Sequence, residues 1–507
     1  MLEDLRQTRI DKQAALAEEG VHPHPDRFAT THDLAAAAAL PEGSTVRVAG
    51  RIVGVRTMGK LSFAHLQDLH GTLQVAIARD SLDPDPEASK ALYQRFVKKV
   101  DRWDFIGVEG ELFRTKTGEI TVQVRAWSFL GKALQPPADK WKGQRNTEMN
   151  WRRRYVDLLA NAESRERFRV RGRVIRALRA HLDAHGFDEV DTPVLCNQAS
   201  GALARPFTSH HNALDMEVVL RIAPETYLKR CVVAGYNRVY EFARCFRNEG
   251  WAPSHLQEFT MLEFYAAYWN YEDNMAFTES LIRHVVQEAT GGLVVRRGEA
   301  EIDFGQPWPR VSLRDLIVQH AGIDIDVHPT AAALRAAIAA AGVEIERPEA
   351  GRGSLIDQLY KRTARPKLIQ PTFVIRHPID LSPLARRADD NPAVADRFQL
   401  VVDTWELLNA YSELVDPLDQ RARLEEQARL RADGDDEAMP LDEDYLLAME
   451  HGMPPISGWG MGIERFVALL TNAPNLRDVV LFPLMRKELP GEADADAEAD
   501  ADAPPAE

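Results

Sequence analysis

The residues best suited to chemistry gather in the stretch 239–268, VYEFARCFRNEGWAPSHLQEFTMLEFYAAY. Alternating residue types predict two strands, and the segment GWAPSH between them predicts a loop. Arg247 and Glu249 share one face of the first strand. The second strand carries four functional side chains on one face: Phe259, Met261, Glu263 and Tyr265. This combination is too polar for an ordinary core and suits a nucleotide bound with a cationic partner, although a solvated hairpin is the alternative.

Two further carboxylates extend this set. Glu225 occurs in RIAPETYLKR, and Glu413 occurs in NAYSE. Together with Glu263 they would repel one another and raise each other's pKa unless a cation joined them. An ammonium group supplies one charge and three donors, so the three carboxylates predict a substrate with an amino-terminated side chain. Taken singly, Glu225 could instead cap a helix.

The strand that leads to Glu413 supplies neighbours for these carboxylates. Asn409, Tyr411 and Glu413 alternate on one face of that strand. Tyr265 and Tyr411 would flank an aliphatic stem, and Gly201 would leave room beside it. Core packing is the alternative for Tyr411 alone.

Two glycine-containing segments match phosphate-binding loops only in part. The segment 54–60, GVRTMGK, is followed by Leu61 where a P-loop needs Ser or Thr, and no helical pattern follows it, so we expect a β-turn. The segment 458–462, GWGMG, precedes the helical run ERFVALL but lacks the spacing of a dinucleotide-binding fingerprint. Its glycines would allow a ligand to approach the backbone closely, next to Arg465 at the start of the helix.

The N-terminal part predicts a small β domain. Residues 1–40 predict a helical extension, and five period-two runs follow within 41–135: STVRVAGRIVGVR, LSFAHLQD, TLQVAIARD, DFIGVEGELFR and EITVQVRAWSFL. Five short strands suit an OB-fold barrel, a common binder of single-stranded nucleic acid, and a β-sandwich fragment is the alternative. Residues 136–150 predict a linker.

The larger part of the chain, 151–489, mixes helical and strand patterns. A 3.6-residue period covers about 152–186, and the strand-like FDEVDTPVL follows. We expect a helical insertion at about 310–365. The tail, 490–507, is rich in Ala, Asp and Glu, cannot bury a core, and is expected to be disordered.

Composition limits the classes of function. The 507 residues carry a net charge of −15, so nucleic acid would have to bind at local basic patches. No apolar run approaches roughly 20 residues, so no membrane span is expected. The charged N-terminus is not a signal peptide, and three cysteines without a C-x-x-C pair favour a reducing, cytoplasmic setting.

Three segments in order along the chain resemble the motifs of a known family. FDEVDTPVL, then FRNEG with EFTMLEFY, then GWGMGIERF are similar to motifs 1, 2 and 3 of class II aminoacyl-tRNA synthetases, in the bacterial lysine-specific form. The resemblance extends from about Arg47 to Arg486. It implies an α+β fold in which an OB-fold anticodon-binding barrel precedes a catalytic domain with an antiparallel sheet flanked by helices.

The resemblance also implies a function and partners. The activity would be that of a lysine–tRNA ligase, with ATP and lysine as substrates, Mg²⁺ as cofactor and tRNA(Lys) as partner. A homodimer would form through the motif 1 region near Pro193.

The resemblance assigns six residues to ATP: Arg247, Glu249, His255, Phe259, Glu406 and Arg465. Arg247 and Arg465 would be catalytic, with Arg247 on the α-phosphate that the substrate carboxylate attacks. Phe259 would stack on adenine, and Glu249 would contact the adenine amino group. His255 and Arg465 would neutralise the outer phosphates.

Seven residues would bind lysine by the same resemblance: Gly201, Glu225, Glu263, Tyr265, Asn409, Tyr411 and Glu413. Glu406 would bind Mg²⁺, for which one to three ions are expected, with Gln399 and Glu413 as further candidate ligands. Gln399 stands where the family usually has a glutamate, so one negative charge is lost. A second departure is Leu256-Gln257, where the family commonly has Asn-Pro.

The pattern in 397–415 predicts a hairpin that turns at 403–404. Strict alternation along its second strand puts Glu406 and Asn409 on opposite faces. A shared site therefore requires a bulge or bend within 406–409.

Four barrel residues match positions that read anticodon bases in the family: Arg56, Phe63, Gln74 and Glu119. Stacking on Phe63, with polar contacts to base edges, is chemically reasonable for unpaired bases. Barrel core is the alternative for Phe63 taken alone.

Three other functions are alternatives to this one. An aspartyl- or asparaginyl-tRNA synthetase shares the domain plan but would need Arg or Lys where Glu263 and Glu413 stand. Relatives that attach a lysine-like amino acid to a protein generally lack the barrel. A divergent paralogue, with a lysine-like substrate or a non-catalytic RNA-binding role, is indicated only by Gln399 and the Leu256-Gln257 pair.

Overall fold

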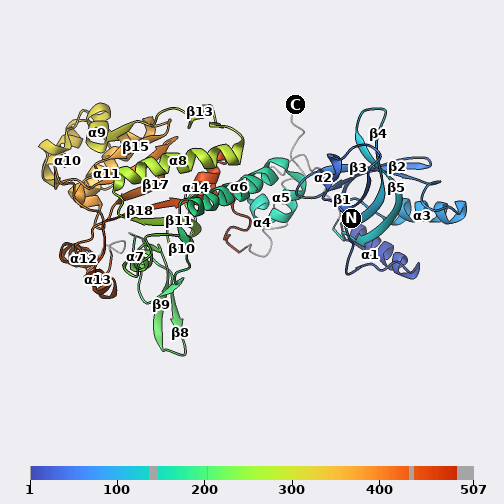
Figure 1. Ribbon diagram of the computed structural model, residues 1–507, viewed down its shortest axis with the longest axis horizontal. Helices are drawn as coiled ribbons and strands as arrows, with labels where there is room; N and C mark the ends of the chain where they lie inside the picture. Colours follow the sequence, from blue (N-terminus) through green and yellow to red (C-terminus); the bar gives the residue numbers. More distant parts are fainter. Residues whose placement is uncertain (1, 136–146, 203, 433–438, 488–507) are drawn as a thin grey trace. The chain divides into compact units, whose positions relative to one another are not determined.

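The chain is described here as a computed structural model, which divides into two compact units, Met1–Arg145 and Asn146–Glu507 (Figure 1). The described residues are 2–135, 147–202, 204–432 and 439–487. The linker expected at 136–150 lies mostly outside these residues, and the tail expected at 490–507 lies wholly outside them.

Five strands of the first unit close into a barrel in the order β1-β2-β3-β5-β4. They are β1 (Thr45–Met58), β2 (Leu61–Gln67), β3 (Thr72–Ala78), β4 (Phe105–Arg114) and β5 (Ile120–Gly131). Alternate side chains such as Val48, Leu66 and Val75 fill its core, as the period-two pattern predicts. The predicted five-stranded barrel is confirmed, and the sandwich alternative is wrong. The segment GVRTMGK ends in the β1–β2 turn at Gly59, as expected.

Three helices accompany the barrel: α1 (Leu2–Glu18), α2 (Leu34–Ala38) and α3 (Pro86–Lys99). The sequence analysis did not predict α3, which lies between β3 and β4. It begins at Asp85, whose carboxylate accepts hydrogen bonds from two backbone N–H groups of the first turn. Its Tyr93 and Phe96 reach the barrel core.

An eight-stranded sheet forms the centre of the second unit, in the order β14-β15-β16-β17-β18-β11-β10-β6. Its strands are β6 (Asp188–Glu189), β10 (Arg238–Phe246), β11 (Glu258–Ala267), β14 (Arg310–Ser312), β15 (Thr372–Ile375), β16 (Arg397–Val402), β17 (Trp405–Ser412) and β18 (Ile456–Gly462). All neighbours run antiparallel except β14–β15 and β10–β6. Two small sheets flank it, formed by β7 (Leu195–Cys196), β8 (Thr208–His211) and β9 (Met216–Leu220), and by β12 (Val294–Arg297) and β13 (Ala300–Asp303).

The helices of the second unit surround this sheet (Figure 1). They are α4 (Thr147–Arg152), α5 (Arg154–Ala160), α6 (Ala162–Ala184), α7 (Glu225–Val233), α8 (Tyr271–Thr290), α9 (Leu313–Ala321), α10 (Ala331–Ala340), α11 (Arg352–Thr363), α12 (Pro417–Ala432), α13 (Glu443–Glu450) and α14 (Ile463–Leu470). Helices α6, α8 and α14 bury one face of the sheet, where Phe264 and Trp459 stack with ring centroids 5.0 Å apart. The predicted α+β fold class is confirmed, and the opposite face of the sheet is left for a site.

The residues expected as an insertion form α9, α10 and α11, with a core of their own. Leu316, Leu334 and Ile356 belong to an apolar cluster that also includes Val374 of β15 and Val401 of β16. This cluster attaches the helices to the β14 end of the sheet.

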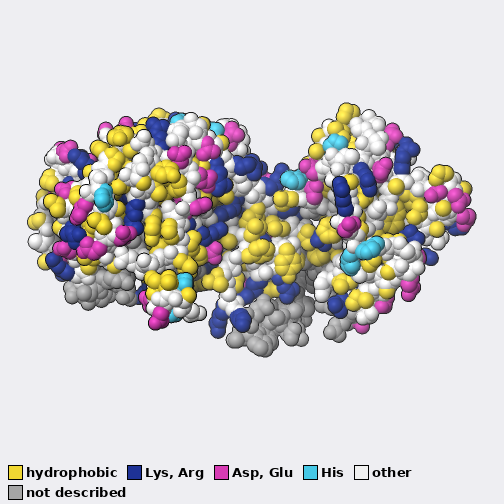
Figure 2. All heavy atoms as spheres, turned by 60° about the horizontal axis from the view of Figure 1, so that its bottom comes forward, with side chains coloured by type: hydrophobic (Ala, Val, Ile, Leu, Met, Phe, Trp, Pro, Cys, Tyr) yellow, Lys and Arg dark blue, Asp and Glu magenta, His cyan; other side chains and the backbone are white. Residues whose placement is uncertain are grey.

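The surface carries both signs of charge. Figure 2 shows acidic and basic side chains interspersed on the face that it presents. Within the described part of the chain, no helix combines the length and apolar character needed to cross a bilayer.

Candidate active site

The sheet face away from α6, α8 and α14 carries a pocket of about 390 Å³. Its walls come from β11, β17 and β18, from the loop after β10, and from the first residues of α7 and α14. Every residue assigned above to ATP or to lysine lines this pocket. The geometry therefore brings the predicted residues together, while their individual roles stay predictions.

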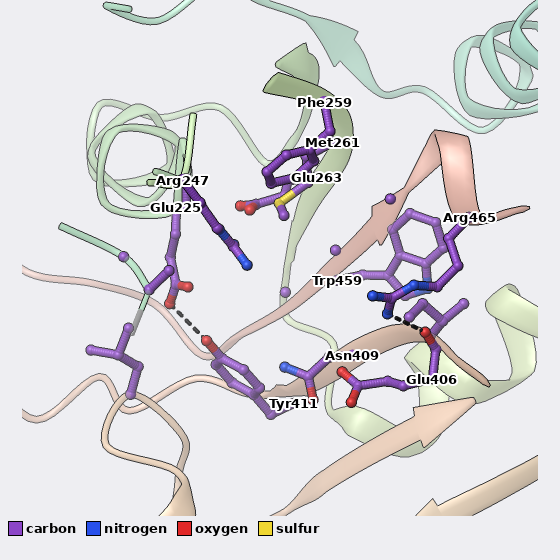
Figure 3. A pocket seen from close by; sticks show the side chains of 18 of the residues that line it. Glu225, Arg247, Phe259, Met261, Glu263, Glu406, Asn409, Tyr411, Trp459 and Arg465 are labelled. Carbon is purple, nitrogen blue, oxygen red and sulfur yellow. Dashed lines mark hydrogen bonds between the residues drawn. The ribbon is translucent and has the colours of Figure 1, made fainter. Parts of the chain in front are cut away.

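The β10–β11 hairpin forms one wall, with the strand pattern that the sequence predicted. The strands pair antiparallel, with Cys245 opposite Phe259 and Glu241 opposite Glu263. Arg247 lies just beyond the end of β10, and its backbone N–H still donates to the carbonyl of Gln257, over 2.9 Å. The Arg247 side chain reaches into the pocket (Figure 3), where its guanidinium lies 5.1 Å from the Phe259 ring centroid.

The loop after β10 is held in place by Leu256 and Gln257, the two residues that differ from the family pattern. Leu256 is buried and packs against the main core of the unit. The Gln257 amide donates to the carbonyls of Glu249 and Gly250, over 3.4 and 3.3 Å. These contacts give the loop an anchor without the usual Asn-Pro pair, and His255 lies exposed at its rim.

A β-bulge brings Glu406 into the same pocket. Leu400 of β16 pairs with Leu408, but the next residue, Val401, pairs with Glu406, so Leu407 is the extra residue. The bulge reverses the alternation of faces, so that Glu406 and Asn409 both line the pocket. The bulge required by a shared site is therefore present. The expected turn at 403–404 is also present, and both of its residues have positive φ.

The two ends of the pocket hold different groups. Arg465 lies at one end, where its Nη1 donates to the main-chain carbonyl of Glu406, over 2.6 Å. The other end holds the three carboxylates. Tyr411 donates to Glu225 over 2.8 Å, as Figure 3 shows, and Tyr265 donates to Glu263 over 3.2 Å.

The carboxylates are not equivalent. The Lys229 Nζ lies 2.6 Å from Glu225 Oε1 and 2.5 Å from Glu413 Oε2. Among the described residues, Glu263 has no ion-pair partner, although Arg247 acts on it from farther away. Burial and the nearby Glu225 carboxylate raise the pKa of Glu263 to about 8.

Two positions at the carboxylate end of the pocket have no room for a side chain and are glycines. A Cβ atom at Gly458 would lie 2.1 Å from a Glu413 oxygen and 2.3 Å from the Tyr265 ring. Gly201 has a φ of +85°, and a Cβ there would lie 2.9 Å from the Cβ of Glu225. Side chains at these positions would fill the space that the substrate is expected to use.

Three residues of the site were not found from the sequence. Arg397 lines the pocket and holds Asn409 through a 2.8 Å hydrogen bond. Glu464 fixes the start of α14, because it accepts hydrogen bonds from Arg171 and from the backbone N–H of Thr260. Lys229 lies four residues after Glu225 on α7, a spacing that could have indicated the ion pair.

The candidate metal ligands do not all line the same cavity. Glu406 lines both the main pocket and a smaller cavity, and Gln399 lines only the smaller one. Glu413 is engaged by Lys229, so we do not carry it forward as a ligand. No group of three or more His, Cys, Asp or Glu side chains in the described residues could hold a metal ion. One carboxylate nevertheless fits a Mg²⁺ ion that is bound mainly by substrate phosphates.

Three of the predicted anticodon-reading residues lie on the adjacent strands β1, β2 and β3 of the barrel, and the fourth, Glu119, directly precedes β5. Phe63 of β2 is half-buried and outside the barrel core, and its register partner on β1 is Arg56, which is exposed. The core alternative for Phe63 is therefore wrong. Gln74 donates to Glu119 over 2.8 Å, and a ring nitrogen of His65 lies 3.1 Å from the same carboxylate. His65 was not singled out from the sequence.

Comparison with known proteins agrees with this geometry. A family model described as "tRNA synthetases class II (D, K and N)" matches residues 146–486, and a model of the OB-fold nucleic acid binding domain matches residues 46–130. A lysine–tRNA ligase of Moorella thermoacetica is 45% identical, covering 95% of this chain and 98% of the relative. Those of Pelotomaculum thermopropionicum and Magnetococcus marinus are both 44% identical, covering 96% and 94% of this chain, and 95% and 96% of the relatives.

Proposed function

The chain belongs to the class II tRNA synthetases and, within them, to the lysine–tRNA ligases, and from this premise we propose how its pocket activates lysine for transfer to tRNA. The first step is attack of the lysine carboxylate on the α-phosphorus of ATP. A P–O bond forms to the carboxylate oxygen, and the bond to the leaving pyrophosphate breaks. The carboxylate is ionised at neutral pH, so the step needs no general base and depends on positioning and charge neutralisation.

ATP occupies the part of the pocket that extends from Arg247 to Arg465. Arg247 neutralises the α-phosphate, where negative charge develops during attack. Phe259 stacks on adenine, and the Glu249 carboxylate accepts from the adenine amino group. Arg465 and His255 neutralise the outer phosphates. The 2.6 Å hydrogen bond to the carbonyl of Glu406 supports this role, because it fixes the guanidinium of Arg465 at the phosphate end.

Glu406 would be the protein ligand of a Mg²⁺ ion bound with ATP, and Gln399 of the smaller cavity could add only a neutral oxygen. When bound, the ion supplies charge neutralisation at the phosphates. Glu406 alone supplies only one negative charge. We therefore propose that the phosphates of ATP, and not the protein, determine how many Mg²⁺ ions are bound.

Lysine occupies the carboxylate end. Tyr265 and Tyr411 flank its methylene stem, and its positive charges meet Glu225, Glu263 and Glu413. An aspartate side chain would bring a further negative charge to the same carboxylates, so the pocket rejects it. Ornithine is one methylene shorter, a difference worth only about 1–3 kcal/mol in such a pocket.

The barrel reads the anticodon in this proposal. Phe63 offers a half-exposed ring for stacking, and Gln74 and Glu119 offer polar groups for base edges. The activated lysine is then attacked by a terminal hydroxyl of tRNA(Lys), the 3′ hydroxyl by analogy with the class. The new ester forms as AMP leaves.

We also propose a homodimer through the region near Pro193. Val194 and Leu195 follow it and are 38% and 55% exposed, which is unusual for adjacent aliphatic side chains. A mass of two chains in sedimentation equilibrium, reduced to one chain by Leu195→Glu, would support this interface. A single-chain mass for the unaltered protein would contradict it.

The observation that carries the proposal is the gathering of three carboxylates and two arginines in one pocket, with Arg247 beside the carboxylates and Arg465 at the far end. Charging assays with tRNA(Lys) test it, using lysine and aspartate as alternative amino acids. Charging with lysine and not with aspartate is expected. Arg247→Ala should reduce lysine activation by about 10²-fold or more, because a transition-state donor is lost. Unchanged activation in that variant would exclude the proposed role of Arg247.

A further inference from the structure

Lys229 is a buried cation that the proposed reaction does not use. Its side chain is 0% exposed and does not line the pocket, whereas its partners Glu225 and Glu413 do. It belongs to α7, one turn after Glu225, and it faces Glu413 just after the end of β17. One ammonium group therefore bridges two pocket carboxylates from behind.

The surroundings of this ammonium are complete without any ligand. Besides the two carboxylates, three aromatic rings lie around it, with centroids 5.8 to 5.9 Å from Nζ: Tyr265, Tyr411 and Tyr445. Aromatic faces attract cations, and the attraction grows when water is excluded. The protein thus holds one amino-terminated side chain permanently beside the site proposed for another.

The bridge leaves particular oxygens free. Lys229 lies within ion-pairing distance of Oε1 of Glu225 and Oε2 of Glu413. No donor in the described residues meets either oxygen of Glu413 with hydrogen-bonding geometry, so its contact with Lys229 is an ion pair and its Oε1 has no partner. A buried carboxylate oxygen without a partner is costly, and a ligand that donates to it would remove that cost.

The charges of the three carboxylates and of Lys229 also indicate that Lys229 supports the pocket. Three enclosed carboxylates would repel one another, and some would take up protons, if no cation stood among them. Burial lowers the pKa of Lys229, but Glu225 and Glu413 outweigh burial and hold that pKa well above its ordinary value. The ammonium is therefore charged, and it offsets one of the three carboxylates.

We propose that Lys229 is a positioning residue for amino-acid selection, which holds Glu225 and Glu413 in place through its two ion pairs and turns their free oxygens toward the substrate. This inference rests on the proposed lysine pocket. The pocket then keeps carboxylates that are not offset by Lys229 and can pair with the positive charges of a lysine substrate. Six titratable groups face Lys229 or its partners and share in this balance: Glu225, Glu263, Tyr265, Tyr411, Glu413 and Tyr445. Arg247 acts on the same cluster through Glu263.

Lys229→Met tests the proposal, because methionine keeps the length and loses the charge. Lysine-dependent ATP–pyrophosphate exchange should show a KM for lysine at least about tenfold higher, since one unit of pKa corresponds to a factor of ten. The KM for ATP should stay within about twofold, because ATP binds at the other end. The rise of kcat/KM for lysine with pH should shift upward by about one unit, because the carboxylates lose a neighbouring cation.

Arg230→Met is the matched control on the same helix. Arg230 pairs with Asp442 and Asp444 and does not line the pocket, so its loss should leave both KM values unchanged. If Lys229→Met left the KM for lysine and its pH profile unchanged, the proposal would be overturned. Equal increases of both KM values with a lower melting temperature would also overturn it, because Lys229 would then be a general scaffold residue.

A second variant decides the question if Lys229→Met does not fold. Lys229→Met with Glu413→Gln removes one positive and one negative charge together, so it should fold and melt above the single variant. A double variant that melts as low as the single one would contradict a charge-balancing role. Failure of the unaltered protein to exchange with lysine would instead contradict the pocket assignment itself.

Discussion

Arg465 at the start of α14 donates a hydrogen bond to the backbone carbonyl of Glu406, the residue at the edge of the β17 bulge, over 2.6 Å. This contact joins the glycine-rich strand β18 and its helix to the neighbouring strand. It places a cation and a carboxylate beside each other at the end of the pocket that we propose for the phosphates (Figure 3). Under the proposed function, Arg465 neutralises phosphate charge there, and Glu406 holds the cation that binds with ATP.

Arg465→Ala should reduce lysine-dependent exchange by about 10²-fold, as expected for loss of a preorganised donor at the phosphates. The KM for ATP should rise and the KM for lysine should change little. Steady-state exchange at varied ATP and lysine measures both constants. Arg296→Ala is the control, because that arginine is 83% exposed on β12 and does not line the pocket. Equal effects on both substrates would contradict a phosphate role.

Gln399→Glu should lower the Mg²⁺ concentration that gives half-maximal exchange, because it adds a negative ligand near Glu406. Both side chains line the smaller cavity, so they are close enough for this test. Glu406→Gln is the opposite change and should raise the Mg²⁺ requirement. Mg²⁺ titrations of exchange at fixed ATP compare the three proteins. Identical titration curves would mean that neither side chain binds the ion.

Much of this site could be predicted from the local alternation of residue types, but the exact position of the bulge could not. Alternation predicted the β10–β11 hairpin and required an irregularity within 406–409. It could not say that Leu407 is the extra residue, because either strand of a pair can carry a bulge. The barrel strands were likewise predictable, and α3 was missed although Asp85 and Pro86 are typical of a helix start.

Long-range pairs were the other limit. Lys229 has the sequence signature of an ordinary helical lysine, and only the fold brings Glu413 to it across the chain. Arg397 was missed for a different reason: its partner Asn409 lies in the same predicted hairpin, but the pattern does not show which of its side chains bond to each other. Such contacts depend on how the sheet is assembled, which residue types alone do not specify.

The pH profile of lysine use reports on Glu263. Burial and the Glu225 carboxylate raise the pKa of Glu263 to about 8 in the free protein. Below that pH the carboxyl is protonated and cannot pair with an ammonium, and above it the carboxylate is ionised. The value of kcat/KM for lysine should therefore rise with pH and level off above about 8, since this ratio reports groups of the free enzyme.

Glu263→Gln is the control for this profile. Glutamine keeps the shape and cannot ionise, so the rise should disappear while the KM for lysine increases. A profile that keeps the same rise in Glu263→Gln would assign the titration to another group.

Phe63→Ala should weaken charging of tRNA(Lys) by about tenfold or more, because loss of one aromatic platform costs roughly 1–3 kcal/mol per stacked base. Lysine-dependent exchange should stay unchanged, since that step does not involve tRNA. Aminoacylation at varied tRNA measures the effect. Phe105→Ala removes another partly exposed phenylalanine of the same barrel and should leave charging unchanged. Equal losses in both variants would indicate a damaged barrel instead of a lost base contact.

The most direct measurement is amino-acid-dependent ATP–pyrophosphate exchange with lysine, ornithine, arginine, aspartate and asparagine, each with and without Mg²⁺. The account predicts Mg²⁺-dependent exchange with lysine and none with aspartate or asparagine. Exchange with aspartate, or no exchange with any of the five in folded protein, would contradict the claim that the three carboxylates select lysine for activation.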